Sequence, residues 1–441
     1  MLDSTLIDSL LLRLFRFRTR GFMKMADADG RVPPVPAGGA HLYVHIPFCE
    51  VLCPFCSFHR VQHHHGPARR YFAALRDEIR LYHAAGHRFT GVYFGGGTPT
   101  CEPDELIETI ALVRALFGVT DISVETNPKD LQPELLAQLR DAGVTRLSVG
   151  VQSFDDQLLR EMERFAKYGS GVETAERIRQ AASYFPTLNV DLIFNQPHQA
   201  IESLRRDLEI FRTLGANQVS MYPLMTSPTV QRRMERSMGR TDQRRLRRFY
   251  QEIVSQLAPD FAPTSAWCFT RAGQGSDEYL VASENYVGVG SGAFSYLDGT
   301  LYATSFSLQT YNERIAAGLT GITTSHRLGD TDRMRYTLLV KMFGLGLDRE
   351  WAQARHGRKF FRKLWGELRT MEVLGAAIPD AQGWKLTPRG MFWLMLMMSE
   401  FFESVNAYRD AMRAHVKDEL DRYAAPCPAL VGDAVRQPVF N

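Results

Sequence analysis

The chain has 441 residues, of which 45% are hydrophobic and 23% charged, and its formal net charge is +3. This length predicts two or three domains with a sizeable core, and so small a charge gives no reason to expect a nucleic-acid partner. Three of the six cysteines lie in one short stretch, which is not the pattern of a disulfide framework, and no apolar run is long enough to span a membrane. We therefore expect a protein of the reducing cytoplasm.

Residues 1–40 predict an amphipathic helix followed by a linker. Leucines recur on one side of residues 1–24 with arginines around them, and residues 27–40 are rich in proline and glycine. We expect the helix to pack on the barrel described next. A helix that binds a membrane surface or a partner protein is the alternative.

Strands and helices then alternate over residues 41–265. Each of six short apolar runs is followed by helical sequence, which is typical of a parallel sheet with helices outside. The predicted strands are 42–46, 91–94, 121–125, 146–150, 189–194 and 218–222. Six units are too few for a complete eight-unit barrel. The sequence therefore predicts an α/β fold with a partial, three-quarter TIM-type barrel.

The pattern changes after residue 265. Residues 266–324 form a glycine-rich segment that we expect to close the barrel, and residues 325–425 predict a mainly helical C-terminal accessory domain. The apolar run 391–398 is too short to cross a membrane and predicts a buried helix. Residues 426–441 are expected to be a poorly ordered tail.

The first strand leads into the stretch LYVHIPFCEVLCPFCSFHR, with the spacing C-x3-C-x2-C at Cys49, Cys53 and Cys56. Soft thiolates select an iron–sulfur cluster or zinc. Structural zinc normally takes a fourth protein ligand, and neither His59 nor the histidine run 63–65 is convincing in that role. A four-iron, four-sulfur cluster with one iron free to bind a small molecule explains three cysteines better. From the triplet alone, a zinc site or a structural role for the cysteines remains an alternative.

This triplet, with Phe55 before its last cysteine, resembles the radical SAM signature. The longer string YVHIPFC, residues 43–49, is similar to the subgroup around oxygen-independent coproporphyrinogen III oxidase and its haem-carrier relatives. The resemblance implies that the cysteines bind three irons and that S-adenosylmethionine (SAM) chelates the fourth. Cleavage of SAM would then give a 5′-deoxyadenosyl radical that abstracts hydrogen.

Further site residues follow the next strands, where chemistry gathers in barrel folds. The turn containing Gly96, Gly97 and Thr98 is similar to the family's motif for the amino group of SAM, and a plain tight turn is the alternative. Glu125 matches an acidic residue that contacts SAM, although it could equally be a helix cap or part of a salt bridge. In the related oxidases, glutamine and arginine at the positions of Gln152 and Arg164 bind the ribose and the SAM carboxylate. A surface arginine is the alternative for Arg164.

Two residues within strands complete the predicted site. Asp191 lies in an otherwise apolar strand, where an isolated carboxylate is costly, so it either binds the ribose or meets a cation structurally. Tyr43 resembles a residue beside the cluster and the substrate, which makes it the catalytic candidate, with a core aromatic as the alternative. Phe55 is expected next to the cofactors, and Tyr222 to line the cavity. Cys101, Cys268 and Cys427 are expected to be free thiols.

Two departures from the family pattern bear on the substrate. Phe58 stands where the oxidases carry a further cysteine, and Asn195-Gln196-Pro197 replaces a usual Gly-Leu-Pro. Three hypotheses remain: a radical oxidoreductase acting on an organic substrate such as a tetrapyrrole, a radical SAM methyltransferase using two SAM molecules, and a haem carrier with little catalysis. An electron donor such as flavodoxin or ferredoxin is the expected protein partner.

Overall fold

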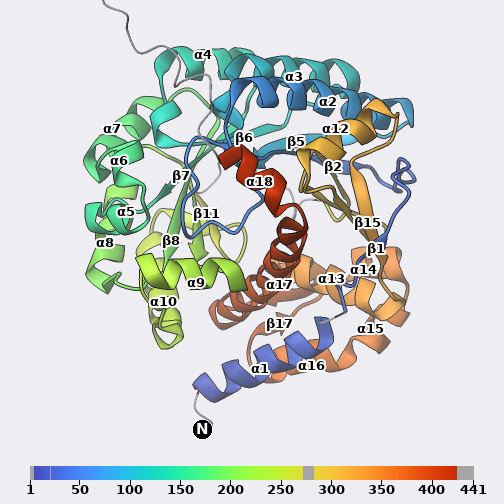
Figure 1. Ribbon diagram of the computed structural model, residues 1–441. Coiled ribbons are helices and arrows are strands. Elements are labelled where there is room, and N and C mark those ends of the chain that lie inside the picture. Colours follow the sequence, from blue (N-terminus) through green and yellow to red (C-terminus); the bar gives the residue numbers. More distant parts are fainter. Residues whose placement is uncertain (1–3, 20, 272–282, 425–441) are drawn as a thin grey trace, which may run out of the picture.

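Six adjacent parallel strands form the centre of the protein (Figure 1). The computed structural model describes residues 4–19, 21–271 and 283–424. The strands run in chain order, each parallel to the next. They are β2 (Ala40–Ile46), β5 (Phe89–Gly96), β6 (Ile122–Thr126), β7 (Arg146–Gln152), β8 (Thr187–Phe194) and β9 (Gln218–Pro223). The predicted partial barrel is therefore confirmed.

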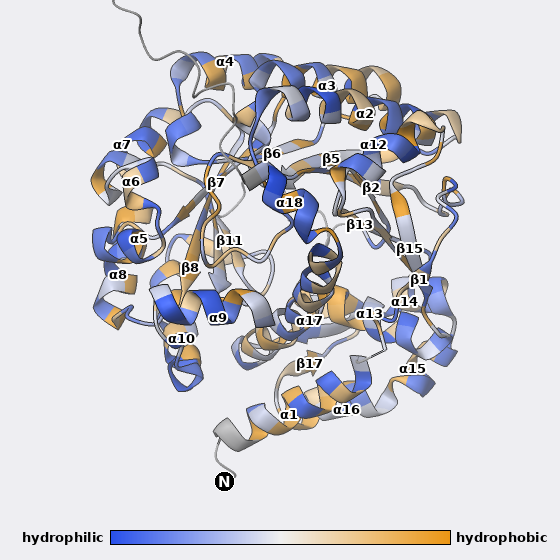
Figure 2. Cartoon of the chain, in the orientation of Figure 1, coloured by the Kyte–Doolittle hydropathy of each residue, from blue (hydrophilic) through white to orange (hydrophobic). Residues whose placement is uncertain are grey.

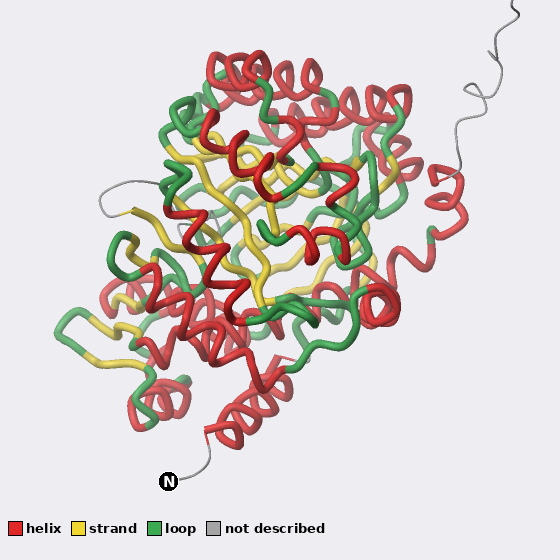
Figure 3. Tube along the Cα trace, turned by 90° about the vertical axis from the view of Figure 1, so that its left-hand side faces the viewer, coloured by secondary structure: helices red, strands yellow, loops and turns green. Residues whose placement is uncertain are grey.

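Helices cover the outer face of this sheet (Figures 2 and 3). Val44, Val124 and Val190 are fully buried, because a parallel sheet with covered faces leaves little of its strands in water. The covering helices turn apolar sides inward and polar sides to solvent (Figure 2). They are α2 (His65–Ala84), α3 (Pro103–Phe117), α4 (Pro133–Asp141), α5 (Asp156–Glu161), α7 (Gly171–Ala181), α8 (Ile201–Arg212) and α10 (Leu246–Leu257).

The sheet continues beyond both edges of the parallel strands. At one edge β12 (Tyr286–Val289) lies parallel to β2 and is followed by the antiparallel strands β13 (Phe294–Leu297), β14 (Thr300–Thr304) and β15 (Ile322–Arg327), then β1 (Ala26–Asp27). At the other edge β11 (Cys268–Arg271) and β10 (Phe261–Pro263) follow β9. Within the described residues the strand order is linear, and the strands of the segment 266–324 lengthen the sheet, most of them at its β2 edge. That this segment closes the barrel stays a prediction.

The C-terminal region is mainly helical, as predicted. It contains a small sheet of β16 (Gly346–Asp348), β18 (Gly383–Leu386) and β17 (Ala377–Pro379). Its helices are α13 (Asp330–Phe343), α14 (Arg349–His356), α15 (Lys359–Lys363), α16 (Trp365–Val373), α17 (Pro388–His415) and α18 (Lys417–Ala424). The apolar run 391–398 forms a largely buried part of α17, which continues toward the open centre of the barrel (Figure 1).

The N-terminal helix α1 (Ser4–Thr19) packs mainly on α17, and the packing on the barrel that we expected is a minor part of its contacts. An ion pair joins Arg16 to Glu400 of α17. Contact with the barrel comes from Asp8, whose carboxylate lies 2.6 Å from Arg247 of α10. The apolar side of α1 therefore covers the C-terminal region, which the sequence pattern alone did not indicate. Among the described residues, no helix combines the length and apolar character of a membrane span.

Candidate active site

The three clustered cysteines lie on a loop that is held at both ends. After β2, the short strand β3 (Phe48–Cys49) pairs with β4 (Val61–Gln62). This pairing holds together the two ends of the loop formed by residues 50–60. Cys49 and Cys53 are buried, Cys56 is partly exposed, and none of the three forms a disulfide. Arg60 donates hydrogen bonds from Nη1 to the Cys53 carbonyl (2.9 Å) and from Nη2 to the Cys56 carbonyl (2.8 Å).

Positive charge and a hydroxyl surround the thiols. Burial raises the pKa of the Cys49 thiol to about 11, and the Thr98 hydroxyl, 3.6 Å from its Sγ, acts in the opposite direction. Arg164 Nη1 lies 3.7 Å from the Cys53 Sγ. Burial lowers the pKa of Lys167, and the nearby cysteines oppose that change. Three free thiols in a basic surrounding fit an iron–sulfur cluster, since metal coordination deprotonates a thiol outright.

The glycine turn after β5 contacts the Glu125 carboxylate. The Gly96 N–H donates to Oε2 at 3.1 Å, and the Tyr93 hydroxyl donates to Oε1 at 2.7 Å. A Cβ added at Gly97 would lie 2.5 Å from the Phe48 carbonyl oxygen, so close backbone approach requires glycine there. The turn and Glu125 therefore lie together beside the cysteine loop.

Arg164 is buried at 4% exposure, so the surface position considered for it is wrong. Its Nη2 donates to the Gly150 carbonyl and lies 3.4 Å from the Asn127 Oδ1. The Asn127 amide in turn donates to the Thr98 hydroxyl at 2.8 Å. A continuous polar network thus joins the ends of three strands to the cysteines. Gln152, at the end of β7, has a φ of 76°, an uncommon backbone conformation for a residue with a side chain.

Asp191 lies partly exposed on β8. Its carboxylate accepts hydrogen bonds from the Ser148 hydroxyl and the Asn189 amide, both at 2.8 Å. Phe55 is buried and packs in a small apolar cluster with Cys53 and Met162. The positions of these predicted residues suit contact with a cofactor at the barrel mouth, and their roles stay predictions.

Tyr43 faces a cavity of about 100 Å³ and also contacts a buried histidine. Its hydroxyl lies 3.0 Å from the His45 Nδ1, and its ring stacks on Tyr93 with centroids 6.1 Å apart. Burial raises the pKa of Tyr43 well above its usual value. Trp267 lines this cavity, whereas Tyr222, which was expected to do so, packs on Trp267 with ring centroids 5.2 Å apart.

The sequence reading missed several residues of this region. Arg60 could have been suspected, because it lies in the same stretch as the cysteines. Asn127 follows Glu125 closely in the chain. Arg409 and Arg413 could not have been suspected from the sequence, because they lie on α17, far along the chain from the cysteines. Arg409 is 7% exposed, and its guanidinium lies over the rings of Phe58 and Phe294 at 4.9 and 5.4 Å. Burial and the charge of Arg60 lower the pKa of Arg413.

The three remaining cysteines are not part of the C-x3-C-x2-C triplet. Cys101 and Cys268 form no disulfide, as expected. Burial raises the pKa of Cys101 well above its usual value. Cys427 lies outside the described residues.

Comparisons with known proteins agree with this geometry. The Radical SAM superfamily matches residues 43–211. The heme chaperone HemW of Bacillus subtilis is 31% identical over 62% of this chain and 75% of its own length. The oxygen-independent coproporphyrinogen III oxidase of Cereibacter sphaeroides is 34% identical over 46% of each chain.

The fold has a solved counterpart. The structure of coproporphyrinogen III oxidase (HemN) from Escherichia coli covers 84% of this chain and 91% of its own, with a TM-score of 0.68 and 23% sequence identity. The signature cysteines, the partial barrel and these relatives lead to one assignment. The chain belongs to the radical SAM superfamily, in the subgroup that contains oxygen-independent coproporphyrinogen III oxidases and HemW heme chaperones, and its cofactors are a four-iron, four-sulfur cluster and SAM.

Proposed function

We propose that this protein is a radical SAM oxidoreductase that acts on a tetrapyrrole. One observation carries the proposal: a continuous polar network from three strand ends meets a loop with three free thiols at the barrel mouth. In this proposal Cys49, Cys53 and Cys56 bind iron. The cluster that they would hold would supply one electron to cleave SAM, which would give methionine and a 5′-deoxyadenosyl radical able to take a hydrogen atom from the substrate.

The surrounding side chains would bind and orient SAM. Arg164 suits the SAM carboxylate, because a guanidinium is a planar donor fork that matches it. Glu125, together with the turn containing Gly96, Gly97 and Thr98, suits the amino group, since a carboxylate and exposed carbonyl groups accept from a cationic amine. Asp191 and Gln152 would accept hydrogen bonds from the ribose hydroxyls. Phe55 would pack beside the cluster.

The residues that line the cavity suit a flat, anionic substrate. Its wall is mostly aromatic and aliphatic, and it contains Tyr43 and the buried guanidinium of Arg409. Apolar walls suit a ring system, and a guanidinium suits a carboxylate side chain, which together describe a tetrapyrrole with acidic substituents. The volume of about 100 Å³ is below that of pockets for large ligands, so side chains such as Phe58, 42% exposed, must move when a macrocycle binds.

We also propose that different segments of the chain bind the cofactors and the substrate. Residues 41–265 would bind both cofactors, while 266–324 and the accessory domain 325–425 would shape the substrate cavity. A flavodoxin or ferredoxin would supply the electron. The reducing cytoplasm is the proposed compartment, because a cluster with an open iron is sensitive to oxidation.

The test is SAM cleavage by anaerobically reconstituted, dithionite-reduced protein. We expect 5′-deoxyadenosine by mass spectrometry, with a yield that rises when the right tetrapyrrole is added. The variant with Cys49, Cys53 and Cys56 all changed to alanine should lose iron and SAM cleavage together. Normal cleavage by that variant would contradict the radical mechanism. A methylated product would instead assign a methyltransferase.

A haem carrier is the second candidate. The similarity to HemW heme chaperones over most of their length favours it, as does Phe58 in place of the oxidases' further cysteine. Full cluster loading with tight haem binding, and no deoxyadenosine under any condition, would select this function over the enzyme.

A further inference from the structure

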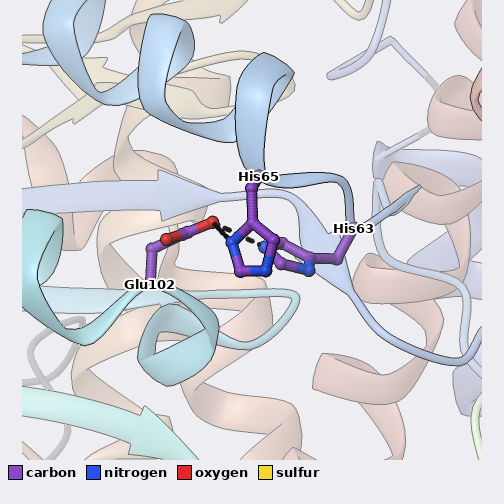
Figure 4. Close-up of side chains that lie close together, drawn as sticks. All are labelled: His63, His65 and Glu102. Carbon is purple, nitrogen blue, oxygen red and sulfur yellow. Dashed lines mark hydrogen bonds and ion pairs between the residues drawn. The ribbon is translucent and has the colours of Figure 1, made fainter. Parts of the chain in front are cut away.

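Two histidines and a glutamate converge beside the cysteine loop (Figure 4). His63 follows β4, His65 is the first residue of α2, and Glu102 directly precedes α3. The His63 Nε2 lies 2.8 Å from the Glu102 Oε1, and the His65 Nδ1 lies 2.7 Å from the same oxygen. All three candidate ligand atoms lie within 4.8 Å of one another.

We propose that His63, His65 and Glu102 bind one divalent transition-metal ion, Zn²⁺, separately from the iron of the cluster. Two imidazole nitrogens and a carboxylate oxygen are an established zinc donor set, which leaves one position for water. This site does not depend on the proposed radical function, because none of its ligands belongs to the cysteine triplet or to the SAM contacts.

The two nitrogen–oxygen distances need only small changes to hold such an ion. Ligands at the usual zinc distances lie roughly 3.3 Å apart in a tetrahedron. The two nitrogen–oxygen separations are 2.7 and 2.8 Å, so they would open by about half an ångström on binding. His63 and Glu102 have side chains only 10% and 7% exposed, which fixes two ligands in advance, and His65 at 77% exposure can turn to admit the ion.

The position gives the ion a structural role. The backbone N–H of His63 donates to the Cys49 carbonyl at 2.9 Å, so a metal bound by the His63 side chain is coupled to the end of the cysteine loop. Glu102 belongs to the next βα unit. The ion would therefore hold the loop to the start of α3. By linkage its binding would stabilise the folded chain by an amount that rises with the logarithm of its concentration once that concentration exceeds its Kd.

The experiment is a zinc titration of the full chain after anaerobic cluster loading, in competition with a chromophoric chelator. Loading first occupies the three cysteines with iron. We expect one further Zn²⁺ per chain with a Kd below about 1 µM. His65→Ala and Glu102→Gln should each weaken binding at least about 100-fold, because each removes a direct ligand.

His64→Ala is the matched control, because it lies between the two ligand histidines and its Nε2 contacts the Tyr423 carbonyl at 2.7 Å instead. Its zinc affinity should equal that of the wild type. His65 is exposed, so His65→Ala should fold normally, which circular dichroism checks.

Zinc X-ray absorption identifies the ligands directly. The proposal expects nitrogen and oxygen neighbours at about 2.0–2.2 Å and no sulfur at about 2.3 Å. Sulfur neighbours, unchanged affinity in His65→Ala, or a Kd above about 1 µM would each overturn the site and leave three side chains joined by hydrogen bonds. Deoxyadenosine formation is a separate measurement, so failure of one proposal leaves the other intact.

Discussion

At the scale of single residues, Arg60 joins two carbonyl groups of the cysteine loop. One guanidinium binds the carbonyl groups of both Cys53 and Cys56 and is itself 5% exposed. Hydrogen bonds from a charged donor contribute about 1.5–3 kcal/mol each. A lysine carries its charge at a single point and cannot span both carbonyl groups with the same geometry.

We therefore predict that Arg60→Lys loads iron but loses its cluster about tenfold faster when a chelator is added, measured by the decay of visible absorbance. Arg69→Lys, an exposed position on α2, is the control and should decay at the wild-type rate. Equal decay rates for the two variants would show that Arg60 does not hold the loop.

At the scale of elements, the packing of α1 on α17 contains a carboxylate whose charge is unfavourable. Burial, and next the negative charge of Glu400, raise the pKa of Glu403 to about 7, while Arg16 opposes the change. The folded chain then binds this proton more tightly than the unfolded chain. The stabilisation is complete below the ordinary glutamate pKa and is lost as the pH rises through about 7.

We predict that Glu403→Gln raises the thermal midpoint relative to wild type at pH 8 but not at pH 5, by an amount equivalent to about 1–2 kcal/mol after solvent screening. Glu209→Gln, on the exposed side of α8, should show no such pH dependence. A gain that is the same at both pH values would contradict the raised pKa.

The elements also show what the sequence could predict. The ends of α3 have clear local signals, because Pro103 suits a helix start and Gly118, at φ 67°, ends the helix in the left-handed conformation. The six parallel strands were found because buried strands are apolar throughout. The edge strands β12–β15 were not, since short antiparallel pieces with glycines give little periodicity. Arg409 had no local signal at all, because only the tertiary fold places α17 at the barrel mouth.

At the scale of the whole molecule, the cavity proposed for the substrate joins distant parts of the chain. Tyr43 comes from the first barrel strand, and Arg409 from the last long helix. We predict that Arg409→Met raises the KM for a carboxylated tetrapyrrole about 10- to 100-fold with a smaller effect on kcat, because a charge-assisted contact is lost from substrate binding. Arg409→Lys should recover part of the loss. An unchanged KM in Arg409→Met would remove this residue from the substrate site.

The composition of that cavity has a consequence for how such proteins diversify. The superfamily match ends at residue 211, and of the residues lining the cavity only Tyr43 and Phe58 fall inside it. Most of the others come from residue 267 onward. If that cavity binds the substrate, as we propose, mutations that change the preferred substrate can accumulate in the later half of the chain without touching Cys49, Cys53 or Cys56. A lineage could then exchange one substrate for another while it keeps the same cofactor site.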